Sequence, residues 1–235
     1  DVGSADVDEE ELAGHAAACS EEPLGPEEAG LFRAAAARAN YMALDRPEVA
    51  YTAKELCRRM SSPCRADLLG LRRLCRFLLG APREVYHFVW QPPEAPLCIY
   101  ADTDFAGCQW TRRSTSGGCA VRGQHILKHW STTQKTVTLS SGEAELGGAV
   151  KAAAEWIGLQ YLGQYLSLDH SLCLYADSAA AIGICRRAGI GRVRHLAAGQ
   201  LRVQERLREG QFALYKVHGP SNPADLLTKY QIKNS

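Results

Sequence analysis

Apolar residues recur at helical spacing through the first third of the chain, after an opening stretch with only weak periodicity. Three segments with this pattern are predicted to be helices: 27–44, 46–60 and 62–80. Ser62 is expected to cap the third helix and Gly80 to end it. Residues 91–96 carry three prolines, which do not fit inside a helix or a central strand, so we expect a linker there. The chain is therefore predicted to contain a small helical module over residues 27–90.

After residue 96 the pattern changes to short apolar runs separated by turns and helical segments. Strands are predicted over residues 96–105, 135–141, 171–177 and 212–219, with a hairpin over 117–131 that turns at Gly123. Further helices are predicted over residues 142–166, 178–189, 194–210 and 222–230. Strands that first pair in a hairpin and then alternate with helices are typical of a mixed sheet flanked by helices. We expect an α/β domain of this kind over residues 97–235.

Charge is unevenly distributed along the 235 residues, although the formal net charge is only +1. Residues 1–30 contain ten acidic residues and no Lys or Arg. The rest of the chain holds all 27 basic residues and 16 of the 26 acidic ones, a net charge of +11. A basic body suits a polyanionic partner such as nucleic acid, and an acidic leader could shield that body or be simply solvated. We expect residues 1–26 to be a flexible leader.

The nine cysteines do not form the spacings of a zinc site or of a secreted disulfide framework, because their number is odd and no C-x-x-C pair occurs. They are expected to be small buried residues in a reducing, intracellular compartment. No apolar run approaches the ~18 residues that span a bilayer, and no secretory signal is visible. If Asp1 is a processed end, an organelle becomes a further expectation for the location.

Four carboxylates stand at the ends of predicted elements: Asp102, Glu145, Asp177 and Asp225. Each alone is explained as a cap or as a residue that complements a helix dipole. Together they would repel one another unless they were protonated or bridged by cations, and such oxygen ligands suit Mg²⁺ or Mn²⁺. Two ions ~3.5–4 Å apart support phosphodiester hydrolysis. The spacing alone leaves caps and metal ligands as alternatives.

Several motifs resemble the ribonuclease H domain of copia-type LTR retrotransposon polyproteins. They are YADTDFAGCQWTRRSTSGG, SSGEAEL, YADSAAAI and PADLLTK. The preceding segment is similar to the C-terminal thumb or connection end of the adjoining reverse transcriptase, and the resemblance extends over residues 31–229. It implies a ribonuclease H-like mixed five-stranded sheet, and a nuclear or cytoplasmic location. A Y-x-D-D polymerase motif is absent from the sequence, which excludes a complete reverse transcriptase.

The resemblance implies an activity as well as a fold. It assigns the metal-ligand positions to Asp102, Glu145, Asp177 and Asp225, which would bind two Mg²⁺ or Mn²⁺ ions and cleave the RNA strand of an RNA–DNA hybrid. Related enzymes also carry a histidine in the loop before the last acid, where His218 stands, and a histidine suits proton transfer there. An ordinary exposed histidine is the equal alternative.

Two of these assignments rest on the resemblance, because periodicity cannot make them. Asp102 and Asp104 point to the same side of an extended strand, and Glu143 and Glu145 are ~200° apart around a helix. The resemblance selects Asp102 and Glu145 as ligands. Asp104 is then expected to support its neighbour or to cap a loop.

Further residues are expected to contact the nucleic acid. They are Arg112, Arg113, Ser114, Thr115, Ser116, Trp130, Gln134, Lys135, Arg192 and Arg194. After residue 195 the chain lacks the acidic and aromatic run typical of copia relatives, which weakens this expectation. An alternative is therefore a domesticated, catalytically unused fragment whose partners are protein subunits of a larger assembly. A DDE-type transposase on the same fold is less favoured, because the motifs are those of ribonuclease H.

Overall fold

The computed structural model describes residues 22–168, 171–189 and 198–230. It divides into two compact units, with the boundary between Glu84 and Val85. The acidic leader up to residue 21 and the predicted binding residues Arg192 and Arg194 lie outside the described residues. Among the described helices, none is long and apolar enough to cross a membrane.

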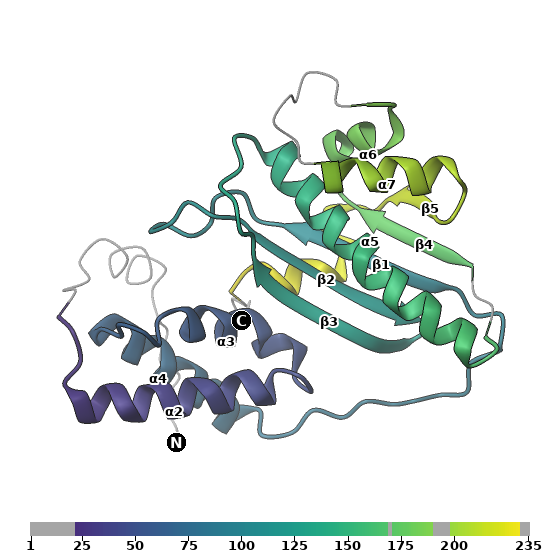
Figure 1. The fold of residues 1–235 in the computed structure, drawn as a ribbon. Helices are drawn as coiled ribbons and strands as arrows, with labels where there is room; N and C mark the ends of the chain where they lie inside the picture. Colours follow the sequence, from purple (N-terminus) through teal and green to yellow (C-terminus); the bar gives the residue numbers. More distant parts are fainter. Residues whose placement is uncertain (1–21, 169–170, 190–197, 231–235) are drawn as a thin grey trace. The chain divides into compact units, whose positions relative to one another are not determined.

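The first unit contains the three predicted helices, labelled in Figure 1. They are α2 (Pro26–Met42), α3 (Pro47–Arg58) and α4 (Arg65–Gly80). Their buried side chains include Phe32, Val49, Leu56, Leu71 and Leu74, which form the interior of the unit. Burial of one apolar face in each helix is what stabilises such short helices.

The start of α4 differs from the sequence prediction, which placed its cap at Ser62. The helix begins at Arg65 with Cys64 as its cap, because the Asp67 carboxylate accepts the Cys64 backbone N–H at 2.8 Å. Pro63 stands before the cap, and its carbonyl accepts the Leu24 N–H at 3.0 Å. The capping bond to Asp67 therefore moves the helix start two residues beyond the position expected from Ser62.

The second unit is built on a five-stranded mixed sheet in the order β3-β2-β1-β4-β5. The strands are β1 (Leu97–Thr103), β2 (Thr115–Arg122), β3 (His125–Thr133), β4 (Leu172–Ala176) and β5 (Ala213–Lys216). The first three pair antiparallel, with the predicted turn at Gly123, whereas β4 pairs parallel to both β1 and β5. This confirms the ribonuclease H-like mixed sheet that the motifs implied.

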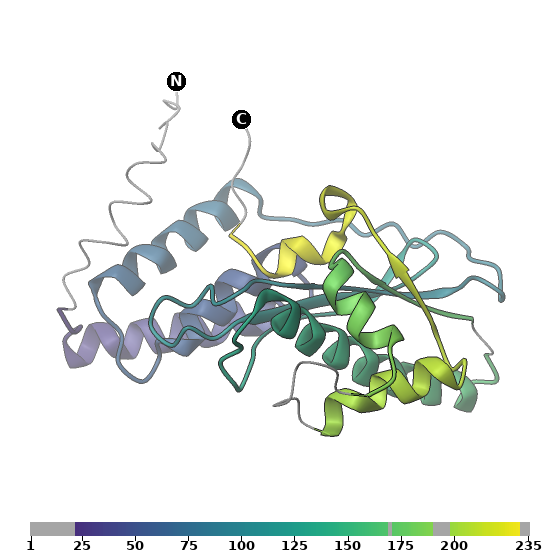
Figure 2. The ribbon, with the colours of Figure 1, turned by 90° about the horizontal axis from the view of Figure 1, so that it is seen from above.

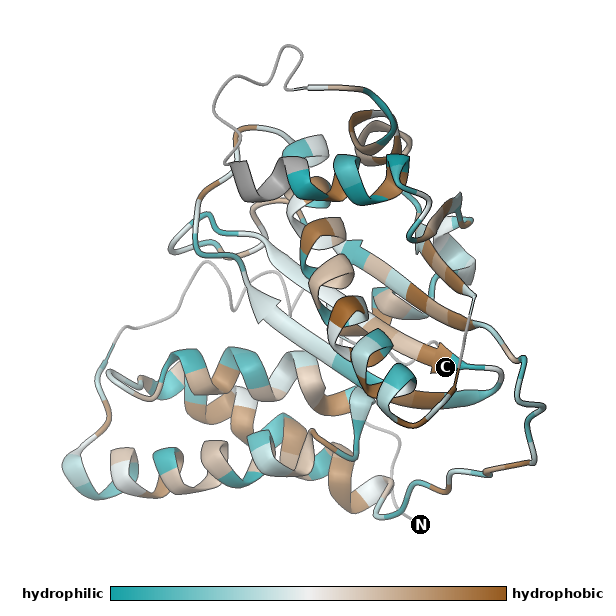
Figure 3. Ribbon diagram, turned by 45° about the vertical axis from the view of Figure 1, so that its right-hand side comes forward, coloured by the Kyte–Doolittle hydropathy of each residue, from teal (hydrophilic) through white to brown (hydrophobic). Residues whose placement is uncertain are grey.

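Helices cover the sheet. They are α5 (Ser141–Tyr165), α6 (Ala179–Arg186), α7 (Ala198–Arg208) and the 3₁₀ helices η1 (Gly219–Ser221) and η2 (Pro223–Leu227). The long helix α5 crosses one face of the sheet, and η2 lies against the opposite face (Figures 1 and 2). The core between α5 and the sheet contains Ile99, Leu146, Trp156 and Leu174, and Figure 3 shows hydrophobic residues along these elements.

For two segments of this unit the predicted type of secondary structure is wrong. The segment 135–141 is not a strand, although its alternating β-branched residues suggested one. It leads from the edge strand β3 to the start of α5, and its apolar residues Val137 and Leu139 point to solvent. The predicted helix over 222–230 is instead the short 3₁₀ turn η2, which begins at Pro223.

Candidate functional site

Asp102 and Asp177 lie side by side at the same end of two neighbouring strands. β1 and β4 run parallel with Ala101 opposite Ala176, so the residues that follow them are at the same level in the sheet. Neighbouring strands are about 4.8 Å apart, which brings the two carboxylates together. Asp102 is buried, with 5% of its surface exposed, and Asp177 is half-buried.

Glu145 reaches the same place from the first turns of α5. Helix α5 approaches β1 closely at Gly148, where a Cβ would lie 2.2 Å from Thr103 Oγ1. Any larger residue there would push the helix away from the strand, so this glycine determines how deeply Glu145 extends toward the strand ends. The glutamate is thus positioned by backbone packing three residues further along the helix.

The alternative ligand Glu143 has a structural role. Ser140 Oγ accepts the Glu143 backbone N–H at 3.3 Å, and the Glu143 carboxylate accepts the Leu139 N–H at 2.8 Å. This reciprocal arrangement caps the helix start and satisfies two backbone donors that have no partner in the helix. Glu143 is buried in this role, whereas Glu145 faces Asp102 and Asp177.

Asp102, Glu145 and Asp177 each offer a carboxylate oxygen, and these oxygens lie within 4.8 Å of one another. Burial is the main cause that raises the pKa of Glu145 to about 8, and the negative charges of Asp102 and Asp177 contribute to the same shift. Burial also raises the pKa of Asp102, although a hydrogen bond from Thr228 opposes the shift. Without a cation, the cluster therefore holds a proton on Glu145 at neutral pH.

A divalent cation fits this cluster. Asp177 Oδ1 is buried and has no hydrogen-bond partner among the described residues, which leaves a carboxylate oxygen with unused ligand capacity. Three hard oxygen donors from different elements, without cysteine or histidine among them, match the ligands of Mg²⁺ and Mn²⁺. Asp102, Glu145 and Asp177 are therefore the residues that would hold a metal here.

Thr228 supports Asp102 from the opposite face of the sheet, a residue that sequence reasoning did not single out. Its hydroxyl donates to Asp102 Oδ2, and its methyl group lies over Gly117, which pairs with Asp102 across β1 and β2. A Cβ at Gly117 would lie 2.7 Å from Thr228 Cγ2 and 2.9 Å from Leu227 Cβ, so the glycine makes room for η2. The signal for this contact was present in the motifs, since Gly117 ends RRSTSG and Thr228 belongs to PADLLTK.

Asp225 is near this cluster but outside the group of three. Its carboxylate accepts a hydrogen bond from Lys229 Nζ, and both side chains are partly exposed. The negative charge of Asp225 is close enough to raise the pKa of Asp102. That hydrogen bond is also the main reason why the pKa of Lys229 lies above its usual range. Asp225 is thus held by a lysine at the rim of the site.

Asp104 does not join the group of three either. Its carboxylate accepts the Thr115 N–H, and its own N–H donates to the Thr115 carbonyl at 3.1 Å, so it closes the loop between β1 and β2. This agrees with the expected loop cap. His218 is exposed and precedes η1, where a Cβ on Gly219 would lie 3.7 Å from Asp177 Oδ2. The loop that carries His218 therefore adjoins the carboxylates.

The residues that were predicted to contact nucleic acid divide into exposed and buried ones. Arg112, Arg113 and Lys135 are exposed, and contact with nucleic acid stays a prediction for them. Several others are buried and take part in the fold, contrary to the prediction: Ser114, Thr115, Ser116 and Trp130. The hydroxyl of Ser114 accepts the Ala106 N–H at 3.0 Å.

Trp130 and Gln134 have identifiable places in the packing. Trp130 covers Gly118, where a Cβ would lie 2.2 Å from its ring. Gln134 Nε2 donates to Ser116 Oγ at 2.9 Å and to the Ala144 carbonyl at 2.8 Å, which ties β2 to the first turn of α5. Gln134 and Ser116 therefore help to position the helix that carries Glu145.

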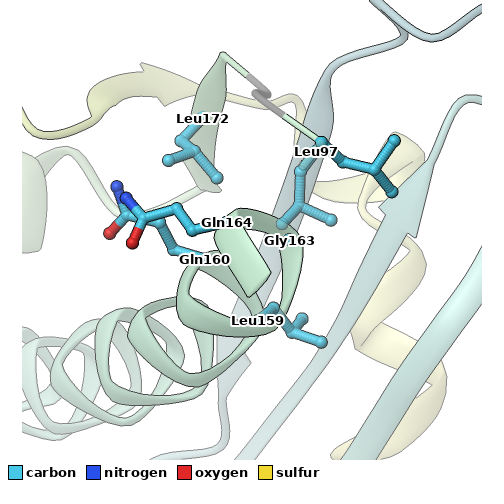
Figure 4. Close-up of a pocket in the computed structure, with 7 residues that line it drawn as sticks. Leu97, Leu159, Gln160, Gly163, Gln164 and Leu172 are labelled. Carbon is cyan, nitrogen blue, oxygen red and sulfur yellow. The ribbon is translucent and has the colours of Figure 1, made fainter. Parts of the chain in front are cut away.

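A small pocket elsewhere in the unit is unrelated to the carboxylates. Its lining combines apolar side chains with two glutamines and contains no charged residue (Figure 4). The residues are Leu97, Leu159, Gln160, Gly163, Gln164, Leu168 and Leu172. Leu97 begins β1, so this pocket lies at the opposite end of the strand from Asp102.

Comparison with known proteins shows that the chain is similar to proteins of transposons. No family model matches the chain. It is 35% identical over 126 residues to the uncharacterized mitochondrial protein AtMg00810 of Arabidopsis thaliana, which covers 53% of this chain and 51% of that protein. It is 27% identical over 201 residues to the retrovirus-related Pol polyprotein from transposon RE1 of the same plant, covering 84% of this chain. Its homologues are copia-type retrotransposon Pol polyproteins.

These relatives are longer than the region they share with this chain. The chain spans about half of the mitochondrial protein, and the shared region is 14% of the RE1 polyprotein. Among solved structures, the crystal structure of LC11-RNase H1 in complex with RNA/DNA hybrid is similar over 56% of this chain and 92% of that chain. The sequence identity is 16% and the TM-score is 0.40.

Proposed function

We propose that this chain is a metal-dependent nuclease that hydrolyses the RNA strand of RNA–DNA hybrids. The observation that carries the proposal is the convergence of Asp102, Glu145 and Asp177 from two strands and a helix onto one point. Buried like charges are costly, so a cluster that persists in the fold is best explained by a cation that bridges it. The similarity to a retrovirus-related Pol polyprotein from a transposon supports the hybrid as substrate.

The proposed cofactors are two Mg²⁺ or Mn²⁺ ions, held by Asp102, Glu145 and Asp177, with Asp225 at the rim. Such ions supply an activated water and stabilise the oxygen that leaves the phosphate. The protein contributes the positions of the ligands: Thr228 orients Asp102, and the close approach of α5 at Gly148 places Glu145. Rigid support of this kind keeps the ligands in place without a reorganisation cost.

The remaining contributions come from residues at the rim of the site. His218 is exposed in the loop beside Asp177, where it would transfer a proton as the product leaves. Asp225 would exchange its contact with Lys229 for the metal site. Arg112, Arg113 and Lys135 would contact phosphates of the hybrid, and Arg192 and Arg194 remain predicted for the same role.

The alternative, an unused fragment that serves as a structural subunit, is not favoured. A protein without selection for catalysis has no physical reason to retain three buried or half-buried carboxylates at one point. Replacement by neutral residues would remove the cost of burying these charges and their repulsion, which together raise the pKa of Glu145. The presence of all three carboxylates is therefore the feature that favours a nuclease over a structural subunit.

Cleavage of a labelled RNA–DNA hybrid in Mg²⁺ tests the proposal. Asp102→Asn preserves the shape of the side chain but weakens its metal binding, and we expect cleavage to fall by more than the roughly 10–100-fold typical of residues outside the ligand shell. Asp104→Asn is the matched control, since an amide oxygen still accepts the Thr115 N–H. We expect this control to retain most of the activity.

A thermal shift with Mn²⁺ separates loss of metal binding from loss of folding. The wild-type protein is expected to melt at a higher temperature with Mn²⁺ than with EDTA, because a ligand that binds the folded state stabilises it. Asp102→Asn should lose this shift while it keeps the wild-type circular dichroism. Equal cleavage by Asp102→Asn and wild type, or no cleavage by either, would refute the nuclease.

A further inference from the structure

The loop between β1 and β2, residues 104–114, displays two large aromatic side chains to solvent. Phe105 is 48% exposed and Trp110 is 59% exposed, whereas Ala106 and Cys108 between them are buried. Exposed aromatic rings of this size are unfavourable in water unless they serve a contact. The motifs that define the family resemblance do not account for Trp110, whose side chain is mostly exposed.

Hydrogen bonds hold this loop in one conformation. They join Asp104 to Thr115, Ala106 to Ser114, Cys108 to Arg113 and Arg112 to Cys108. The Arg112 N–H donates to the Cys108 carbonyl at 2.7 Å, and Ala106 and Arg112 have φ angles of 53° and 52°. Non-glycine residues adopt such angles only where the surroundings enforce them. A partner that contacts Trp110 therefore meets a largely pre-organised surface, which lowers the entropy cost of binding.

The loop lies directly beside the carboxylates. It begins two residues after Asp102, and the negative charge of Asp104 is close enough to act on Glu145. Arg112 and Arg113 in the same loop are exposed. Aromatic faces next to guanidinium groups are the combination by which proteins bind single-stranded nucleic acid, through base stacking and phosphate contacts.

Trp110 cannot stack on a base within a paired hybrid, because the bases there are stacked on both faces and only the outer faces of the terminal pairs are open. An unpaired base presents a free π-face, which every nucleobase has. We infer that the β1–β2 loop binds an unpaired nucleotide next to the hybrid, with its base stacked on Trp110 and its phosphates near Arg112 and Arg113. This inference rests on the proposed function, and it specifies the substrate further: the protein prefers hybrids that carry a single-stranded extension to blunt hybrids.

Fluorescence titration in EDTA tests the inference without any cleavage. Of the four tryptophans, Trp130 and Trp156 are buried, so a Trp90→Phe background leaves Trp110 as the exposed reporter. We expect a hybrid with a single-stranded extension to quench this fluorescence and to bind more tightly than the blunt hybrid. Trp110→Ala should weaken binding of the extended hybrid by roughly tenfold, as expected for loss of one base–aromatic stack, and leave the blunt hybrid unchanged.

Trp90→Ala is the matched control, because Trp90 is 82% exposed and precedes β1 at the end of the strand away from Asp102. It should change neither affinity. Equal losses for blunt and extended hybrids in Trp110→Ala, or no loss for either, would overturn the inference. A protein that binds extended hybrids through Trp110 in EDTA but never cleaves them in Mg²⁺ would refute the nuclease alone and keep the stacking site.

Discussion

At the scale of single residues, identical side chains two positions apart have different roles because their neighbours differ. Glu143 accepts the Leu139 N–H and completes a helix cap, whereas Glu145 lies against Asp102 and Asp177. Asp104 likewise closes a loop, while its neighbour Asp102 joins the cluster. Hydrogen-bond partners thus separate the structural carboxylates from the candidate ligands more sharply than their positions along the chain do.

The raised pKa of Glu145 predicts how the stability of the metal-free protein depends on pH. A carboxyl whose pKa is about 8 in the folded state, against 4.5 normally, binds its proton more tightly when folded than when unfolded. The free energy of unfolding should therefore fall as pH rises through this range, and its stabilising contribution is complete only below about pH 4.5. Glu145→Gln removes this titrating group. At pH 8 we expect the free energy of unfolding of the variant to exceed that of the wild type by about 1–3 kcal/mol.

Urea denaturation in EDTA at several pH values between 5 and 8 measures this difference. Glu143→Gln is the matched control, because its amide oxygen can still accept the Leu139 N–H. The control should follow the pH dependence of the wild type. Parallel curves for Glu145→Gln and wild type would contradict the prediction and indicate that the carboxyl of Glu145 is solvated.

At the scale of elements, the distance between α5 and β1 is the central feature of the site. The helix can lie close to the strand only because Gly148 has no side chain opposite Thr103. The same principle operates on the other face, where Gly117 allows η2 to approach and Thr228 to reach Asp102. Both sides of the carboxylate cluster are therefore positioned by glycines that lie next to the carboxylates but carry no reactive group themselves.

Gly148→Ala is expected to separate the two elements. Its Cβ would lie 2.2 Å from Thr103 Oγ1, so the helix must shift, and we expect a loss of about 1–3 kcal/mol in the free energy of unfolding. The shift in melting temperature produced by Mn²⁺ should also decrease, because Glu145 moves with the helix. Thermal melts with EDTA and with Mn²⁺ measure both effects.

Gly158→Ala in the same helix provides the comparison. Nothing lies within 4 Å of the Cβ it would add, so the exchange should stabilise the helix by about 0.5–1 kcal/mol through its backbone entropy. The Mn²⁺ shift should remain at the wild-type value. If both alanine variants gained stability, the close contact at Gly148 would not determine the position of α5.

At the scale of the whole molecule, the site belongs entirely to the second unit. Asp102, Glu145, Asp177 and Thr228 all lie after Val85, where this unit begins. The segment before β1 also belongs to it: the Phe88 ring meets the His125 ring at 5.1 Å, and Arg122 Nη2 donates to the carbonyls of Pro92 and Pro93. We propose that this unit folds independently when it includes residues 85–96.

Two fragments test this proposal. Residues 85–235 should unfold cooperatively and keep the Mn²⁺ shift, because they contain all of the sheet and the carboxylates. Residues 97–235 lose the Phe88 and proline contacts, and we expect them to be less stable by about 1–2 kcal/mol. Circular dichroism during heating compares the two. Equal melting temperatures would show that residues 85–96 add nothing to the fold.

The sequence by itself determined the order of the elements and the candidate acids. Hydrophobic periodicity indicated the three helices of the first unit, the hairpin at Gly123 and the helix α5, because these patterns report which face of an element is buried. It failed over residues 135–141, where β-branched residues alternate but no strand forms. Local propensity carries no information about whether a partner strand exists.

Only the tertiary structure decided which of these residues meet. It brought Asp102, Glu145 and Asp177 together. It placed Glu143 and Asp104 where their carboxylates accept backbone N–H groups and cap a helix and a loop. It also buried four residues that were predicted to contact nucleic acid: Ser114, Thr115, Ser116 and Trp130. It also connected Thr228 with Asp102 across 126 positions of sequence. Such contacts depend on strand order, register and the close approaches that glycines permit, which are properties of the packed chain and are not encoded within any one segment.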